Sequence, residues 1–135
     1  MNIPALLIPA DITRPMTIVE IDPDYNAMYS LIGCNLVTVV RPSASLRNMV
    51  DGDCTVWVDD EGLLRENPRQ NIRAFLMTEQ HLVGNALLTG VDNAAGTITP
   101  LQFVLPACTV LNIIEQNAQG LHRIYAAIDA ANANA

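Results

Sequence analysis

The spacing of hydrophobic and polar positions divides the chain into short strands separated by turns. The β-branched, alternating run at 16–21 predicts a first strand. CNLVTVVR at 34–41 is apolar almost throughout, which predicts a strand buried on both faces. Alternation at 54–58 predicts a third strand, and we expect two further short strands at 82–89 and 98–104.

Capping residues mark two helices between these strands. Asp22 followed by Pro23 is typical of a helix start, and Gly33 can adopt the left-handed conformation that ends the helix. The pair Asn67-Pro68 repeats this pattern and predicts a second helix over 68–79. Each helix carries an apolar stripe, which we expect to face the sheet.

The two ends of the chain have different patterns. Residues 1–15 alternate proline with aliphatic residues, which predicts an extended arm with at most an edge strand at 5–8. After Pro106 the period becomes helical, with one helix ending near Gly120 and another following it. The apolar stripe of that last helix comprises Leu121, Ile124, Tyr125 and Ile128.

These elements predict an α+β fold in a single domain, 1–135. We expect a small mixed or antiparallel sheet with two helices packed on one face and a helical C-terminal appendage. The domain would comprise the extended N-terminal arm at 1–15, the α+β core at 16–104 and the C-terminal helices at 105–135.

Composition limits the classes of partner. With 50% hydrophobic but only 16% charged residues, some apolar surface is expected to be covered in a homo-oligomer. The net charge of −7 argues against nucleic-acid binding through the phosphate backbone. Every basic residue is arginine, which excludes a P-loop lysine and Schiff-base chemistry and leaves the guanidinium fork as the cationic group.

The three cysteines, Cys34, Cys54 and Cys108, are unevenly spaced and odd in number, so neither a disulfide framework nor a zinc site is predicted. They are expected to be reduced thiols. The N-terminal run lacks the basic start of a signal peptide, and no stretch approaches the roughly 20 apolar residues of a membrane span. We therefore expect a cytoplasmic protein with no membrane partner.

The acidic residues at 51–61 raise the question of a metal site. A calcium loop starting at Asp51 would require glycine at its sixth position and glutamate at its twelfth, where the chain has Val56 and Gly62. No metal is therefore predicted. The carboxylates are expected at the ends of a surface hairpin, with Asp59 and Asp60 in its turn.

The strongest candidate binding residues follow that turn. Arg69 and Arg73 lie four residues apart just inside the cap at Asn67, where two guanidinium groups beside a helix N-terminus would hold a phosphate or carboxylate. The alternative is an exposed helix face with ordinary ion pairs. In the first interpretation Asp59 and Asp60 would reach ribose hydroxyls or base edges, and Trp57 would stack on a base, although the aromatic content of only 4% favours a structural role for the tryptophan.

No motif specifies a reaction or a cofactor. His81 and His122 have no partner at ligand spacing, and there is no nucleophile elbow, dinucleotide fingerprint or P-loop. The sequence favours a non-enzymatic protein without a cofactor.

Several short motifs occur in a distinctive order. The segment VDDEGLL at 58–64 is followed by Asn-Pro-Arg, then by Leu-Val-Gly-Asn-Ala and an aspartate-containing loop. Over roughly residues 16–104 the chain resembles domain of unknown function 3846, an uncharacterised family carried by phages, plasmids and bacteria. The resemblance transfers no catalytic residues. It implies a protein that binds and neutralises something of the host's, in the host cytoplasm if it is phage-encoded.

Three functions remain open at this point. The first is sequestration of a small anionic ligand, such as a nucleotide signal of antiphage defence, by Asn67, Arg69 and Arg73. The second is inhibition of a host protein by an acidic surface. The third is a metal-assisted hydrolase that uses Asp51, Asp53, Asp59 and Glu61.

Overall fold

The structure is a computed structural model that describes residues 2–66 and 68–133. Its centre is a six-stranded sheet in the order β2-β1-β5-β4-β3, with β6 also paired to β5. All pairings are antiparallel. The strands are β1 (Ile3–Ile8), β2 (Thr17–Ile21), β3 (Val37–Val40), β4 (Cys54–Asp59), β5 (Ala86–Asp92) and β6 (Thr97–Thr99).

Helices cover both faces of this sheet, which gives two hydrophobic clusters. On one face, α1 (Tyr25–Ile32) packs against Trp57 and Leu87. On the other face, α2 (Ala44–Met49), α3 (Ile72–Thr78) and α4 (Ala107–Ala133) pack against Val56 and Leu88. The α+β class is confirmed. The helix after 22 and the helix before 79, expected on the same face, lie on opposite faces.

The N-terminal segment is part of the sheet and not an extended arm. β1 lies between β2 and β5, and Leu6 and Ile8 are fully buried. Pro4 is tolerated because β5 pairs only with Leu6–Ile8 of β1. The Pro4 carbonyl accepts from the backbone N–H of Leu101. The nitrogen of Pro4 points to the same side as this carbonyl, away from β2, and no strand pairs with Pro4 there, so its missing N–H breaks no bond of the sheet.

The expectation that residues 34–41 are buried on both faces is wrong. β3 begins only at Val37 and forms one edge of the sheet, with Val39 exposed. Its hydrophobic run reflects β propensity and not complete burial. The alternation in β4 is confirmed, with Val56 and Val58 in one cluster and Trp57 in the other.

Both of the expected helices begin later than predicted. Asp24 caps α1, because its carboxylate accepts from the backbone N–H groups of Asn26 and Ala27, and Gly33 ends the helix with φ +81° as expected. Asn71 caps α3 by accepting from the N–H of Ala74. Arg69 therefore precedes α3, so it does not lie one turn before Arg73 on a common helix.

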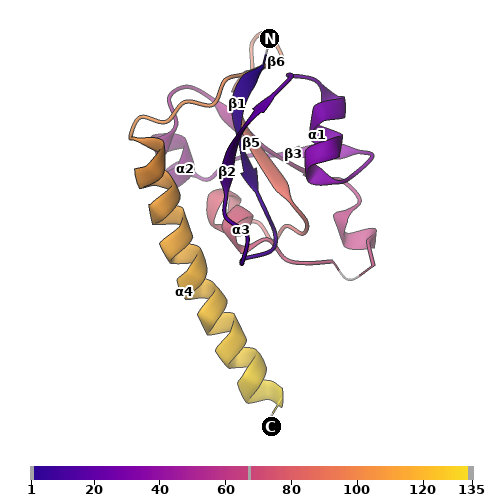
Figure 1. The fold of residues 1–135 in the computed structure, drawn as a ribbon, viewed down its shortest axis with the longest axis vertical. Helices are drawn as coiled ribbons and strands as arrows, with labels where there is room; N and C mark the ends of the chain where they lie inside the picture. Colours follow the sequence, from indigo (N-terminus) through magenta and orange to yellow (C-terminus); the bar gives the residue numbers. More distant parts are fainter. Residues whose placement is uncertain (1, 67, 134–135) are drawn as a thin grey trace.

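The two expected C-terminal helices are one. α4 runs through Gly120 without interruption, and it extends away from the rest of the domain toward the C-terminus (Figure 1). A glycine inside a helix lowers the stability of the helix by roughly 1 kcal/mol relative to alanine. The helix nevertheless continues beyond Gly120. No helix in the described part of the chain has the length and hydrophobicity needed to cross a membrane.

Candidate functional site

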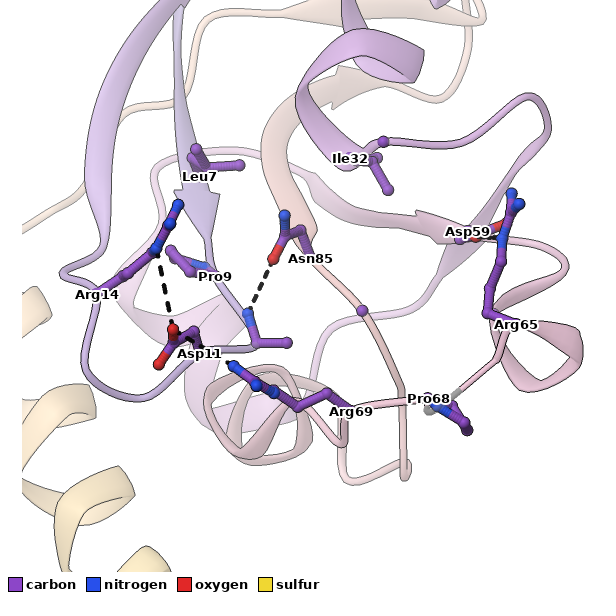
Figure 2. Close-up of a pocket in the computed structure, with 14 residues that line it drawn as sticks. Leu7, Pro9, Asp11, Arg14, Ile32, Asp59, Arg65, Pro68, Arg69 and Asn85 are labelled. Atoms are coloured by element: carbon purple, nitrogen blue, oxygen red, sulfur yellow. Dashed lines mark hydrogen bonds and ion pairs between the residues drawn. The ribbon is translucent and has the colours of Figure 1, made fainter.

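Loops at one end of the sheet line an open cleft of about 500 Å³. Its walls come from the β1–β2 loop, the end of α1, the segment after β4, the residues before α3 and the start of β5 (Figure 2). We call it the arginine cleft and define it by its polar side chains. These are Asp11, Arg14, Asp59, Arg65, Arg69 and Asn85.

One end of the arginine cleft is built on Asp11. The Oδ1 atom of Asp11 accepts from the backbone N–H and the hydroxyl of Thr13, at 3.0 and 2.7 Å. Its Oδ2 atom lies 3.3 Å from Nη1 of Arg69 and 3.9 Å from Nε of Arg14. The hydrogen bonds from Thr13 hold the pKa of Asp11 below its usual range, with smaller contributions from Arg69 and Arg14. Asp11 therefore stays ionised and keeps the two arginines together.

Asp59 and Arg65 form the opposite end of the cleft. The Oδ1 atom of Asp59 accepts from the backbone N–H of Glu61, and its Oδ2 atom accepts from Nε of Arg65, both at 2.9 Å. The hydrogen bond to Asp59 raises the pKa of the Arg65 guanidinium. One carboxylate neutralises one arginine here, whereas two arginines share one carboxylate at the Asp11 end.

Asn85 lies between the two ends. Its Oδ1 atom accepts from the backbone N–H of Ala10 at 3.0 Å, which fixes the orientation of the side-chain amide (Figure 2). Its Nδ2 group forms no hydrogen bond with the described residues. Leu7, Pro9 and Ile32 add apolar surface nearby.

The guanidinium groups of the cleft keep most of their donors unused. Within residues 2–66 and 68–133, Arg65 donates only through Nε, while Arg14 and Arg69 make ion-pair contacts but no hydrogen bonds. Three arginines and two aspartates give the cleft a formal charge of +1 in a chain whose net charge is −7. The arrangement suits an anion, because guanidinium groups bind phosphate and carboxylate oxygens through paired N–H donors.

Arg73 and Trp57 do not line the arginine cleft. Arg73 is only 1% exposed, because its guanidinium is used by Glu115 and by backbone carbonyls of the β1–β2 loop. Trp57 is also buried: its Nε1 donates to the hydroxyl of Thr89 at 3.0 Å, and its ring forms a T-shaped pair with Tyr25. The structure therefore does not bring either side chain together with Arg69 in the cleft.

The other predicted residues divide between the cleft and its surroundings. Arg69 and Asp59 line the cleft, at opposite ends. Asp60 is exposed and lies outside the lining. Asn67 lies outside the residues that the structure describes.

Sequence reasoning missed four polar cleft residues: Asp11, Arg14, Arg65 and Asn85. Residues 11–14, DITR, carry a weak signal, since aspartate two residues before threonine is typical of an Asx turn. Nothing in the sequence indicated that this turn would face Arg69, because the segment was expected to be a peripheral arm.

The carboxylates considered for a metal site do not come together, and the two buried thiols are not activated. Asp51 and Asp53 lie at one end of β4 and Asp59 and Glu61 at the other, so these four cannot share a metal ion. No group of three metal-binding side chains occurs among the described residues. Burial raises the pKa of Cys54 to about 11 and also raises the pKa of Cys34, so both thiols stay protonated at neutral pH.

Comparison with known proteins identifies one relationship. A family model described as Domain of unknown function (DUF3846) matches residues 2–105. This range contains all six strands and every residue of the arginine cleft, and it ends before α4. No curated protein and no solved structure shows a significant match. The chain belongs to the DUF3846 family of domains of unknown function.

Proposed function

We propose that this protein binds a small anionic ligand of nucleotide type in the arginine cleft, without turning it over. The observation that carries the proposal is the gathering of three of the chain's seven basic residues around one open cleft, with most of their N–H groups unused. The cleft volume of about 500 Å³ is typical of sites for small ligands.

The two ends of the cleft suit different parts of such a ligand. Arg14 and Arg69 outnumber their shared carboxylate Asp11, so this end favours a phosphate group. The Asp59–Arg65 pair is balanced in charge, and together with the Nδ2 group of Asn85 it offers donors to neutral acceptors such as base carbonyls. Leu7, Pro9 and Ile32 provide apolar contact for the middle of the ligand.

Binding without turnover is supported by the residues that line the cleft. The described lining contains no histidine, cysteine, serine, threonine or tyrosine. Its two carboxylates are both held by arginine, and Asp11 has a lowered pKa, which makes it a poor general base.

Affinity measurements test the proposal. Isothermal titration with inorganic phosphate, nucleoside monophosphates, cyclic dinucleotides and ADP-ribose at low salt should detect at least one ligand. Arg14→Ala and Arg69→Ala should each weaken its binding by about 10- to 100-fold, the loss expected for a charge-assisted hydrogen bond. Arg123→Ala, an exposed arginine on α4, is the matched control and should leave the affinity unchanged.

The proposal fails if none of these compounds binds, or if binding is indifferent to both cleft substitutions. Mass spectrometry of small molecules released from the purified protein gives an independent assay, because a sequestering protein should retain its ligand. Loss of that retained compound in Arg69→Ala would link it to the cleft.

We also propose a biological setting for this binding. Family domains carried by phages suggest that the ligand is a nucleotide signal of antiphage defence, which the protein would sequester in the host cytoplasm. Expression of the intact protein, but not of Arg69→Ala, should then lower the free concentration of that signal in infected cells. An unchanged signal level with the intact protein would contradict this setting while leaving ligand binding itself intact.

A further inference from the structure

The second half of α4 has no packing partner among the residues that the structure describes. α4 contains 27 residues and is therefore about 40 Å long. Its first half packs on the domain through Val110, Ile114 and Ala118, which are buried. Residues 121–133, all of which the structure describes, include no buried side chain, and this half extends beyond the rest of the domain (Figure 1).

This exposed half carries an apolar stripe, formed by Leu121, Ile124, Tyr125 and Ile128. Ile124 and Ile128 are 56% and 49% exposed. At about 100° per residue, the stripe lies on the same side of α4 as Val110, Ile114 and Ala118. The face that packs on the domain thus continues past its edge, where nothing in the described chain covers it.

Charge around the stripe restricts what can cover it. Residues 121–133 contain only two charged side chains, Arg123 and Asp129. Arg123 lies on the side of the helix opposite the stripe. His122 and Asp129 are seven residues apart, so they lie two turns apart on the same flank of the stripe. A partner surface is therefore required to be apolar at its centre, with polar groups along one flank.

We propose that a second copy of this chain covers the stripe, with the two α4 helices paired antiparallel about a two-fold axis. A two-fold axis perpendicular to both helices places each flank of α4 beside the same flank of the partner's α4, which runs in the opposite direction. Ile124 then packs against the partner's Ile128, and His122 lies beside the partner's Asp129, twice in each dimer. In a parallel pair the flank with His122 would instead meet the opposite flank, which offers no such complement.

An axis near residue 126 places the start of each exposed half beside the tip of the other. The two domains then lie at opposite ends of the paired helices. The stripe contains none of the residues that line the arginine cleft, so a failure of the dimer proposal can be told apart from a failure of ligand binding.

Light scattering after size exclusion tests the dimer. The wild type should have twice the chain mass of 14.6 kDa at micromolar concentrations. Ile124→Glu and Ile128→Glu should each raise the dimer dissociation constant by at least about tenfold, because a buried unpaired carboxylate is unfavourable. Arg123→Glu, on the opposite side of α4, should remain dimeric.

Disulfide cross-linking tests the orientation, in a Cys108→Ser background that removes the exposed native thiol. Ile124→Cys and Ile128→Cys proteins should form a disulfide-linked dimer when mixed and oxidised, and neither should do so alone. A monomeric wild type, a dimer unaffected by either glutamate, or cross-linking of Ile124→Cys with itself would each overturn the proposal. Circular dichroism confirms that each variant is folded.

Discussion

Arg73 shows how one buried charge organises three segments of the chain. Its Nε and Nη2 groups donate to the two oxygens of Glu115 on α4, at 2.8 and 2.9 Å. Its Nη groups also donate to the backbone carbonyls of Pro9, Asp11 and Ile12 at 3.1–3.3 Å. The guanidinium thus links α3, α4 and the β1–β2 loop, and every one of its bonds is internal.

Replacing Arg73 by methionine should lower the free energy of unfolding by about 3–5 kcal/mol, because Glu115 and three carbonyls lose their donor. Urea titration measures the change. Removing the charge from both partners, in Arg73→Met with Glu115→Leu, should recover part of the loss, as expected for a coupled pair. A loss below about 1 kcal/mol for the single substitution would mean that water replaces the guanidinium without difficulty.

Glu115 makes stability depend on pH in the acid range. Its partial burial opposes ionisation, but hydrogen bonds from Arg73 and Gln119 and the charge of Arg73 outweigh this, so the pKa of Glu115 lies below its usual 4.5. The unfolded chain therefore takes up this proton at a higher pH than the folded chain does. The stabilisation is complete above pH 4.5 and decreases as the pH falls through the folded pKa.

Denaturation midpoints between pH 3 and 7 should accordingly be level near neutrality and fall in acid. In Glu115→Gln the acid decrease should be shallower, because this proton uptake is removed, although stability at pH 7 is lower. Equal pH profiles for the two proteins would show that Glu115 contributes nothing to the acid sensitivity.

Among the strands and helices, the structure requires glycine at position 90 but not at position 120. A Cβ atom on Gly90 of β5 would lie 2.5 Å from the carbonyl oxygen of Pro100 and 2.6 Å from Oγ1 of Thr99. A Cβ atom on Gly120 of α4 would meet nothing within 4 Å. β6 therefore approaches β5 closely only because position 90 has no side chain.

Gly90→Ala should destabilise the protein by about 1–3 kcal/mol, since the clash involves backbone that cannot move freely. Gly120→Ala should be neutral or stabilise by up to about 1 kcal/mol, through its higher helix propensity. Thermal melts of the two variants compare them directly. A stabilising Gly90→Ala would contradict the close approach of β6.

The elements that the sequence predicted best are those with local causes. β4 and the end of α1 follow from alternation at 54–58 and from the glycine at 33, which local geometry alone specifies. β1 was expected to be at most an edge strand, because Pro4 within it and Pro9 after it argue against a central strand. Its central pairing depends on where β5 stops. The predicted start of α3 was too early, because Asn67-Pro68 and Asn71 are both suitable caps in the sequence. Tertiary contacts select Asn71, whose side-chain amide also donates to the Ile8 and Gly84 carbonyls.

At the scale of the whole molecule, the arginine cleft forms because the strand order brings distant segments of the chain together. Arg14 and Arg69 are 55 positions apart in the chain, yet both contact Asp11, because β1 lies beside β5 and brings the β1–β2 loop to the segment before α3. Sequence reasoning identified Arg69 and Asp59 as binding residues but could not distinguish an exposed arginine from a buried one four residues later. That distinction requires knowledge of what packs over Arg73.

The hydrogen bonds of Arg73 also mean that the family domain is held in shape by a helix outside it. The carbonyls of Asp11 and Ile12 accept from Arg73, Gln119 of α4 also donates to Ile12, and Arg73 itself rests on Glu115 of α4. The cationic end of the cleft is thus anchored to the same helix whose free half is apolar. Any event that repositions α4 acts on the loop that holds Asp11 and Arg14, and by reciprocity a ligand held there would act on α4.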